Sequence, residues 1–209
     1  MTINDKFAIH AGTVISSSLL NSDLDSFYRF HIVMNSNDPV SQESMEKLAS
    51  MKYIRDYSID FTTFPENILN QALADKKIKF TDNWPSLIMY RLYFDQIFPH
   101  LDSILYLDAD IVVLRDLNSL TYKNSGVVFL NLKNMLLETL QNSKCDFSFP
   151  DQDLLNVAFQ HYIYPLSMRW NFFIYFETQS PYFSYFILHY AGPKPWTTED
   201  KITKYYWRY

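Results

Sequence analysis

Residues 104–117, with the sequence ILYLDADIVVLRDL, constrain the fold of this chain more than any other stretch. The apolar run from Ile104 to Leu107 is too short and too rich in strand-forming residues for a separate helix, so we predict a buried strand. Asp108 and Asp110 follow where that strand ends. In an extended chain, residues i and i+2 share one face with side chains about 6 to 7 Å apart, so both carboxylates can bind one cation.

Carboxylate oxygens suit Mg²⁺ or Mn²⁺, and cations with few protein ligands are typically completed by substrate phosphates. We therefore interpret the two acids as a metal site that binds a diphosphate. Two alternatives fit the same residues. Asp pairs at strand ends also form turns and helix caps. Aspartyl-nucleophile phosphatases carry Asp-x-Asp after an apolar strand, a pattern that residues 108–112 also satisfy.

The composition indicates one globular domain. A chain of 209 residues that is 48% hydrophobic can bury a full core, and residues 1–200 contain no repeat or linker that would divide them. A net charge of -5 argues against a general nucleic-acid binder. Cys145 is the single cysteine, which excludes an internal disulfide and favours a reducing compartment such as the cytoplasm. The apolar stretch from Phe7 to Leu20 has helical spacing, so we interpret it as a buried helix rather than a signal peptide.

Strands and helices are expected to alternate along the chain. The expected strands are a remnant at Met1–Ile3, then Arg29–Met34, Tyr57–Thr62, Ile104–Leu107, Val127–Leu130 and Tyr185–Leu188. The expected helices are Phe7–Leu20, one opened by Asp38-Pro39, Glu66–Lys77, Leu87–Phe98, Lys133–Gln141 and one that begins at Pro150. This alternation predicts an α/β domain with a mostly parallel sheet flanked by helices. Ligands of such sheets gather at the carboxyl ends of strands, where the two acids lie.

Four phrases place polar residues at strand ends or helix starts: LYLDAD at 105–110, NSGVVFLNL at 124–132, DQDLLN at 151–156 and HYAGPKPW at 189–196. Together they resemble glycosyltransferase family 8, the group of lipopolysaccharide galactosyl- and glucosyltransferases and glycogenin. The resemblance runs from about Asn4 to Trp196. It implies the GT-A fold, a Rossmann-like nucleotide-sugar-binding architecture.

The same resemblance implies a metal bound by Asp108, Asp110 and His189. An imidazole nitrogen added to two carboxylates shifts the preference from Mg²⁺ toward Mn²⁺. Gly192 and Lys194 would contact the diphosphate of the donor, because close backbone approach and a fixed cation both suit phosphate. A lone histidine at a strand end is also commonly a structural residue.

Other positions are implied to contact the donor sugar. Asp151 would bond its hydroxyls, Gln152 would lie near the anomeric carbon, and Arg91 would act from the helix at 87–98. The remaining implied donor-binding residues are Asp5, Ala109 and Asn124. Structural alternatives exist, because Asp151 after Pro150 is a good helix N-cap, and an arginine on an amphipathic helix can reach solvent.

The implied activity is retaining, Mn²⁺-dependent transfer of glucose or galactose from a UDP-sugar to a saccharide or lipid-linked saccharide acceptor. Four departures from the family pattern favour an alternative, a catalytically impaired member that only binds nucleotide-sugar or a partner. Only Met1–Ile3 precede the turn that would seat uridine, and only six residues separate Leu117 from Asn124. The stretch from Asn171 to Tyr185 is also short, and Lys194 follows His189 one residue sooner than usual.

The C-terminal segment KITKYYWRY, Lys201 to Tyr209, mixes cations with aromatic residues and contains no acid. Such a mixture suits a lipid interface, so we expect peripheral contact with the inner face of a membrane. Packing of this segment onto the domain is the alternative. Trp196 likewise fits either a core anchor or part of a lid.

Overall fold

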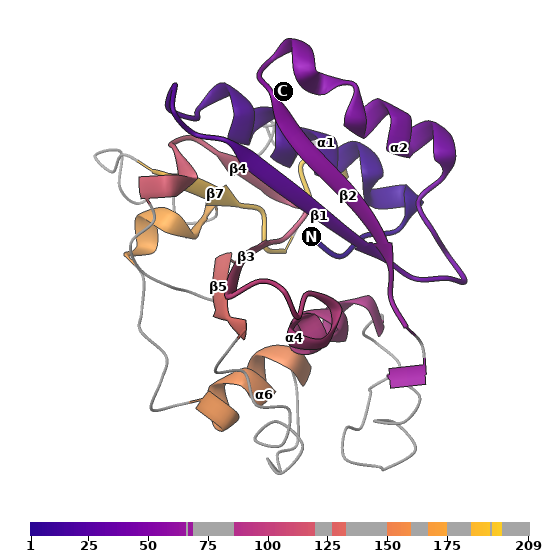
Figure 1. The fold of residues 1–209 in the computed structure, drawn as a ribbon. Coiled ribbons are helices and arrows are strands. Elements are labelled where there is room, and N and C mark those ends of the chain that lie inside the picture. Colours follow the sequence, from indigo (N-terminus) through magenta and orange to yellow (C-terminus); the bar gives the residue numbers. More distant parts are fainter. Residues whose placement is uncertain are drawn as a thin grey trace.

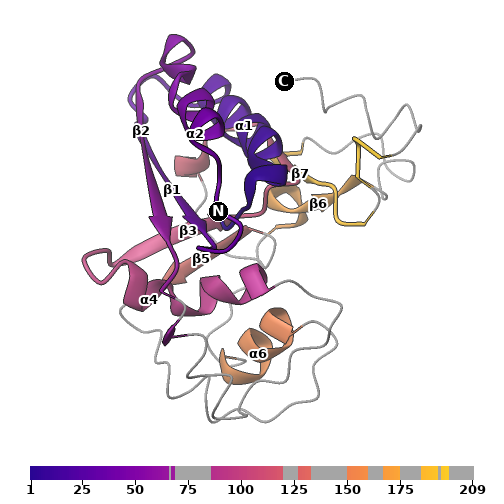
Figure 2. The same ribbon diagram turned by 90° about the vertical axis from the view of Figure 1, so that its right-hand side faces the viewer.

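The computed structural model of this chain alternates helices and strands (Figures 1 and 2). The described residues are 1–65, 67–68, 86–119, 127–132, 150–159, 167–174, 185–192 and 194–197. Several predicted features fall outside these ranges: the helix at 133–141, nearly all of the one at 66–77, the Asn-Ser-Gly turn at 124–126 and the tail at 201–209.

The first helix, α1 (Asp5–Leu20), forms where the spacing of apolar residues predicts it. Its buried apolar residues are Ala8, Ala11, Val14, Ile15 and Leu19. These positions lie three, four or one apart and give the helix one apolar face. On the same face the Ser17 hydroxyl accepts a hydrogen bond of 3.1 Å from the backbone N–H of Val113. This bond ties α1 to the strand β4 (Ile111–Val113), which leads out of the acidic turn.

The strands β1 (Tyr28–Met34) and β2 (Tyr57–Thr63) pair in parallel over their full lengths and confirm the expected strands. On the other edge of β1, Thr2 forms a parallel bridge to Val33. Between the strands, α2 (Gln42–Ala49) is followed by the short η1 (Met51–Tyr53). The expected helix start at Pro39 is wrong, because the Ser41 hydroxyl caps the helix later by accepting from the Ser44 N–H at 3.2 Å.

The predicted α-helix at 87–98 is mostly a 3₁₀-helix. The structure has η2 (Ser86–Tyr93), then one α-helical turn, α4 (Phe94–Ile97). Met89, Tyr90, Leu92, Tyr93 and Phe94 are buried in this segment, and the Tyr90 ring stacks on Phe64 with centroids 3.9 Å apart. Packing on several sides, rather than one apolar stripe, sets the geometry here, because tertiary contacts override helix propensity. The helix α6 (Pro150–Phe159) begins at the predicted residue and packs against η2.

The chain crosses the acidic turn between two strands that belong to different sheets. β3 (Ser103–Leu107) pairs antiparallel with β5 (Val127–Asn131). β4 pairs antiparallel with β7 (Ile187–His189), and β7 pairs in parallel with β6 (Phe172–Phe173). The short 3₁₀ turns η3 (Leu117–Ser119) and η5 (Met168–Trp170) complete the described elements.

The α/β class is confirmed, but the described strands pair in both directions rather than mostly in parallel. The turn at the acids separates β3 from β4, and each of these strands pairs antiparallel with a strand from later in the chain. β4 and β6 were not predicted, and β7 begins two residues later than expected and includes His189. In the described part of the chain, no helix has both the length and the apolar character that crossing a bilayer requires.

Candidate metal centre

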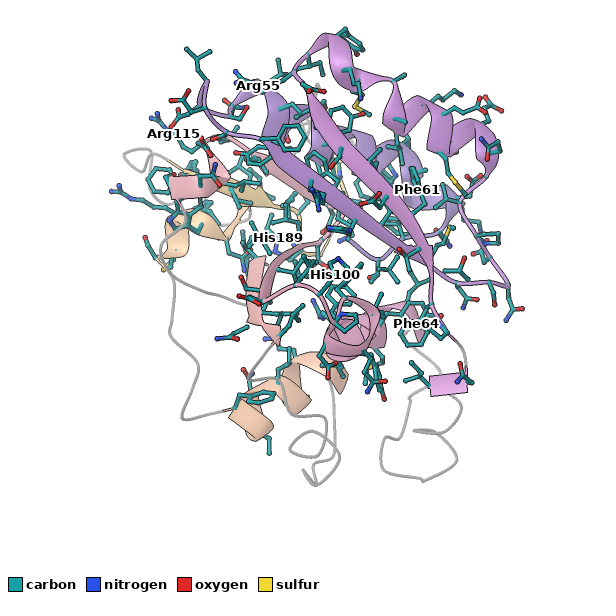
Figure 3. The ribbon with its side chains drawn as sticks, in the orientation of Figure 1. Arg55, Phe61, Phe64, His100, Arg115 and His189 are labelled. Atoms are coloured by element: carbon teal, nitrogen blue, oxygen red, sulfur yellow. The ribbon has the colours of Figure 1, made fainter. Side chains whose placement is uncertain are left out.

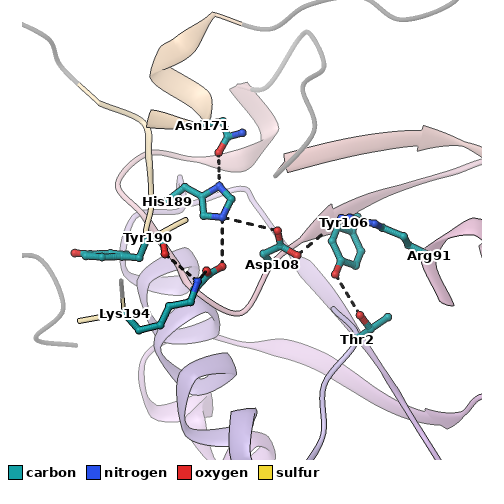
Figure 4. A network of polar contacts seen from close by, with 9 residues as sticks. Thr2, Arg91, Tyr106, Asp108, Asn171, His189, Tyr190 and Lys194 are labelled. Atoms are coloured by element: carbon teal, nitrogen blue, oxygen red, sulfur yellow. Dashed lines mark hydrogen bonds and ion pairs between the residues drawn. The ribbon is translucent and has the colours of Figure 1, made fainter. Parts of the chain in front are cut away.

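The two acids lie in the turn between β3 and β4. Asp108 follows β3 directly, and Ala109 and Asp110 form the turn. They therefore do not form the extended i, i+2 pair that the sequence pattern suggested, yet their carboxylates converge with His189. Figure 4 shows His189 facing Asp108. The side chains of Asp108 and Asp110 are 31% and 14% exposed. Partial shielding from water strengthens the electrostatic contacts that these carboxylates make.

His189 reaches the acids because β7 runs antiparallel to β4. The register places His189 opposite Ile111, and the Tyr190 N–H donates to the Asp110 carbonyl oxygen at 2.9 Å. His189 Nε2 then lies 3.4 Å from Asp110 Oδ1 and 3.8 Å from Asp108 Oδ2. Backbone pairing between two strands thus sets the spacing of the three side chains.

Asn171 orients the His189 ring from the opposite side. Asn171 Oδ1 lies 2.7 Å from His189 Nδ1, and since an amide oxygen can only accept, Nδ1 is the donor. That tautomer leaves the Nε2 lone pair facing the acids. Metal-ligating histidines usually donate their second N–H to such a partner, which fixes the orientation of the ring. The sequence carries no signal for this role, because Asn171 comes here only through the pairing of β6 with β7.

Asp108, Asp110 and His189 each offer one ligand atom, and these atoms all lie within 4.8 Å of one another. Two carboxylate oxygens and one imidazole nitrogen form a mixed donor set, and coordination positions remain for other ligands. Such a set suits Mn²⁺, with Mg²⁺ as the harder alternative. The residues present therefore fit a divalent cation.

Lys194 joins this cluster from the segment that follows β7 (Figure 4). Its ammonium pairs with Asp110 Oδ2 and donates to the carbonyl oxygen of Tyr190 at 2.9 Å. Gly192 has a φ of 106°, a backbone conformation that favours glycine. Although Lys194 follows His189 at a short spacing, its ammonium reaches Asp110.

Burial alone would raise the pKa of Asp110, but His189 and Lys194 outweigh burial and hold that pKa below its usual range.

Arg91 approaches the other acid from η2. Its side chain is 11% exposed, and Nη1 lies 3.9 Å from Asp108 Oδ1. The guanidinium carbon lies 4.8 Å from the centre of the Tyr106 ring, within the range of a cation–π interaction. The Tyr106 hydroxyl shares a hydrogen bond of 3.2 Å with Thr2. The arginine is thus directed toward the acidic turn and not into solvent.

The other predicted site residues are placed differently. Asp5 Oδ1 accepts a hydrogen bond of 2.8 Å from the Ser41 backbone N–H, so this carboxylate contacts the start of α2. Gln152 is exposed near the start of α6. Asp151 lies in the first turn of that helix, but its side chain is outside the described part of the structure, as is all of Asn124.

Trp196 lies at the far end of the segment that carries Lys194. Its ring stacks on His10 of α1, with centroids 3.5 Å apart and planes inclined by 15°. The contact attaches this segment to α1, as an anchoring role for Trp196 requires. His10 was not predicted as a site residue, because a histidine inside an apolar helix gives no indication of its tertiary partner.

A cavity of about 330 Å³ lies elsewhere, between residues 27–30 and β3, with Leu117 and Asn118 also in its lining. None of the residues that approach the metal centre lines it. His189 lies among the elements of the domain, whereas Arg55 and Arg115 lie toward one edge of the view (Figure 3). The convergent donor atoms, and not this cavity, therefore define the candidate site.

Comparison of the sequence with known proteins identifies its family. The profile described as glycosyl transferase family 8 matches residues 1–129 and 122–200. Lipopolysaccharide 1,2-glucosyltransferase of Escherichia coli is 30% identical over an alignment that covers 93% of this chain and 71% of that protein. Glucoside xylosyltransferase 1 of Mus musculus is 25% identical, and the alignment covers 77% of this chain and 52% of that protein.

Solved structures share the fold. An active-site mutant of LgtC superposes with a TM-score of 0.75 at 19% identity, covering 98% of this chain and 92% of that one. The apo structure of the bifunctional glycosyltransferase WbbM gives a TM-score of 0.71 at 20% identity, covering 95% of this chain and 46% of that one. The chain therefore spans about half the length of WbbM and of the mouse xylosyltransferase.

Proposed function

Because the chain belongs to glycosyltransferase family 8 and has the GT-A fold, we propose that it transfers glucose or galactose from a UDP-sugar to a saccharide acceptor with retention of configuration. The observation that carries this proposal is the convergence of Asp108, Asp110 and His189 on one point. A family match that spans both the acids and the HYAGPKPW segment leaves the phosphatase alternative without support.

Asp108, Asp110 and His189 would hold Mn²⁺ in this proposal. When bound, the cation supplies positive charge that stabilises the leaving diphosphate. Lys194 lies beside the Asp110 carboxylate and can offer its ammonium to a phosphate oxygen of the donor. Gly192 permits close approach of the backbone to the diphosphate. The imidazole ligand favours Mn²⁺ over Mg²⁺.

The residues proposed for the donor sugar are Asp151, Gln152 and Asn124, with Arg91 as a further catalytic residue and Asp5 and Ala109 as donor contacts. We infer front-face displacement at the anomeric carbon. The acceptor oxygen bonds to that carbon, the bond from the carbon to the leaving phosphate oxygen breaks, and the acceptor proton passes to the leaving phosphate. Arg91, close to Asp108, lies where a cation can balance charge on the diphosphate side.

The acceptor is proposed to be a saccharide of the cell surface, free or lipid-linked. The name of the Escherichia coli relative, a lipopolysaccharide glucosyltransferase, supports this class. The basic and aromatic tail from Lys201 to Tyr209 would bring the enzyme to an anionic lipid surface. Co-sedimentation with anionic vesicles should decrease for a chain that ends at Asp200, and equal co-sedimentation of both proteins would remove the tail from the proposal.

The test is turnover of UDP-glucose and UDP-galactose with and without Mn²⁺, against simple glucosides and galactosides. Free sugar and transfer product are counted separately, beside an Asp110→Asn control. Mn²⁺-dependent transfer supports the enzyme. Mn²⁺-dependent UDP binding with slow transfer and prominent hydrolysis would favour the alternative of an impaired member. The short connection between Leu117 and Asn124 supports that alternative. Misplacing a reactant by about 1 Å can cost about 100-fold in rate.

A further inference from the structure

The segment that follows β7 is attached to the domain at two places. Lys194 pairs with Asp110 at the metal centre. Two residues later, Trp196 stacks on His10, at 3.5 Å between ring centroids. Phe7, one helical turn before His10, packs edge-to-face with the Trp196 ring, with centroids 6.4 Å apart. The segment is therefore fixed to the acidic turn by a charge and to α1 by an aromatic stack.

The two attachments belong to one short turn. The Lys194 carbonyl oxygen accepts from the Thr197 N–H at 3.0 Å and from the Thr197 hydroxyl at 3.1 Å. Pro195, buried between Lys194 and Trp196, has a φ restricted by its ring. Since consecutive Cα atoms are about 3.8 Å apart, a fixed Trp196 leaves the Lys194 backbone little freedom.

His10 is well suited to fix this turn. It lies on α1, which is held in place by its own buried face. Burial lowers the pKa of His10, and the nearby Asp110 carboxylate only partly opposes this effect. The ring is therefore neutral near pH 7 and presents a flat surface to the indole.

We propose that His10 is a positioning residue that, by stacking on Trp196, holds the 194–197 turn so that the Lys194 ammonium stays at the metal centre. The inference rests on the proposed function, in which Lys194 contacts the donor diphosphate. Without the stack the turn can move, so UDP binding must immobilise the Lys194 side chain. This loss of side-chain freedom weakens UDP binding. With one side chain to immobilise, the expected loss of UDP affinity is about 3- to 10-fold.

The experiment compares His10→Ala and His10→Phe with Ile9→Ala, a control at a neighbouring residue of α1 whose side chain points outward and is 76% exposed. UDP affinity is measured calorimetrically at saturating Mn²⁺. His10→Ala should bind UDP more weakly, His10→Phe should recover most of the affinity because it keeps a ring, and Ile9→Ala should bind like the original chain. Unchanged affinity in His10→Ala, or no recovery in His10→Phe, would overturn the proposal.

A double-mutant cycle with Lys194→Ala separates positioning from a general structural effect. If His10 acts through Lys194, adding His10→Ala to Lys194→Ala should weaken UDP binding no further, whereas full additivity would contradict the proposal.

Acrylamide quenching of Trp196, isolated by comparison with Trp196→Phe, needs no donor. Greater quenching is expected in His10→Ala, and equal quenching would overturn the stack. Mn²⁺-independent UDP binding by the original chain would instead overturn the proposed function, while the quenching result still decides this inference.

Discussion

Asp110 presents its two carboxylate oxygens to two different partners. Oδ1 lies 3.4 Å from His189 Nε2, and Oδ2 pairs with Lys194, which lies 84 positions away in the sequence. The shared carboxylate links the metal centre to the segment that follows β7. Chemistry at either partner should therefore depend on the charge of this one side chain.

Replacing Asp110 with asparagine keeps the shape of the side chain and removes its charge. We expect Mn²⁺ affinity to fall by more than the roughly 10- to 100-fold typical of outer-shell partners, and UDP binding to become independent of Mn²⁺. Calorimetry with Mn²⁺ and UDP checks both. Asp56→Asn, at a side chain that is 79% exposed, is the matched control. Persistent coupling of UDP to Mn²⁺ in Asp110→Asn would contradict the assigned ligand.

Replacing Asn171 with alanine removes the acceptor that orients the His189 ring through Nδ1. The ring can then adopt the other tautomer, so Mn²⁺ affinity should fall by about 10- to 100-fold while the fold is retained. Mn²⁺ titration and thermal unfolding give the two measurements. Asn37→Ala, at an exposed loop position, should change neither. An Asn171→Ala protein that binds Mn²⁺ as tightly as the original chain would exclude the orienting role.

Replacing Ser17 with alanine removes the buried hydroxyl that accepts from the Val113 N–H at 3.1 Å. The strand amide is left without this acceptor, and we expect a loss of about 1–3 kcal/mol in the free energy of unfolding. Denaturant unfolding measures the loss. Ser16→Ala is the neighbouring control, since that hydroxyl only donates to the Thr13 carbonyl oxygen within α1. A loss equal to that of the control would show that the contact with β4 contributes little.

Asp116 connects the loop after α1 to the chain after β4. It is buried and accepts hydrogen bonds from Tyr28 at 2.6 Å, from Ser26, and from the backbone N–H groups of Asp23 and Asn118. Burial alone would raise its pKa, but these donors, Ser26 first, lower it to about 2. A carboxyl with a lowered folded-state pKa stabilises the fold above its unfolded-state pKa, and the contribution disappears as the pH falls through the folded value.

For Asp116 that window runs from about pH 4 down to about pH 2, and the contribution amounts to about 2 kcal/mol. Asp116→Asn should therefore be less stable than the original chain at pH 7, and the difference should shrink over this window. Urea unfolding at several pH values tests the prediction, with Asp60→Asn as an exposed control. A stability difference independent of pH would show that the charge of Asp116 is not the cause.

Local signals predicted much of the fold. The helical spacing between Phe7 and Leu20 and the apolar strands β1, β2, β3 and β5 appear within about two residues of their expected positions. The errors fall where packing decides. The segment at 86–97 buries the adjacent side chains of Leu92, Tyr93 and Phe94 and is mostly 3₁₀-helical, and β6 is too short to have a sequence period.

The sequence by itself determined the proposed ligands of the centre, because the identity and order of Asp108, Asp110 and His189 are local facts that a motif displays. The tertiary structure decided the geometry. His189 meets the acids through the antiparallel register of β7 with β4, and Asn171 and His10 gain their partners from elements far away in the chain. Such pairings depend on strand register and on the packing of a helix against a turn, and neither leaves a periodic signal in the residues concerned.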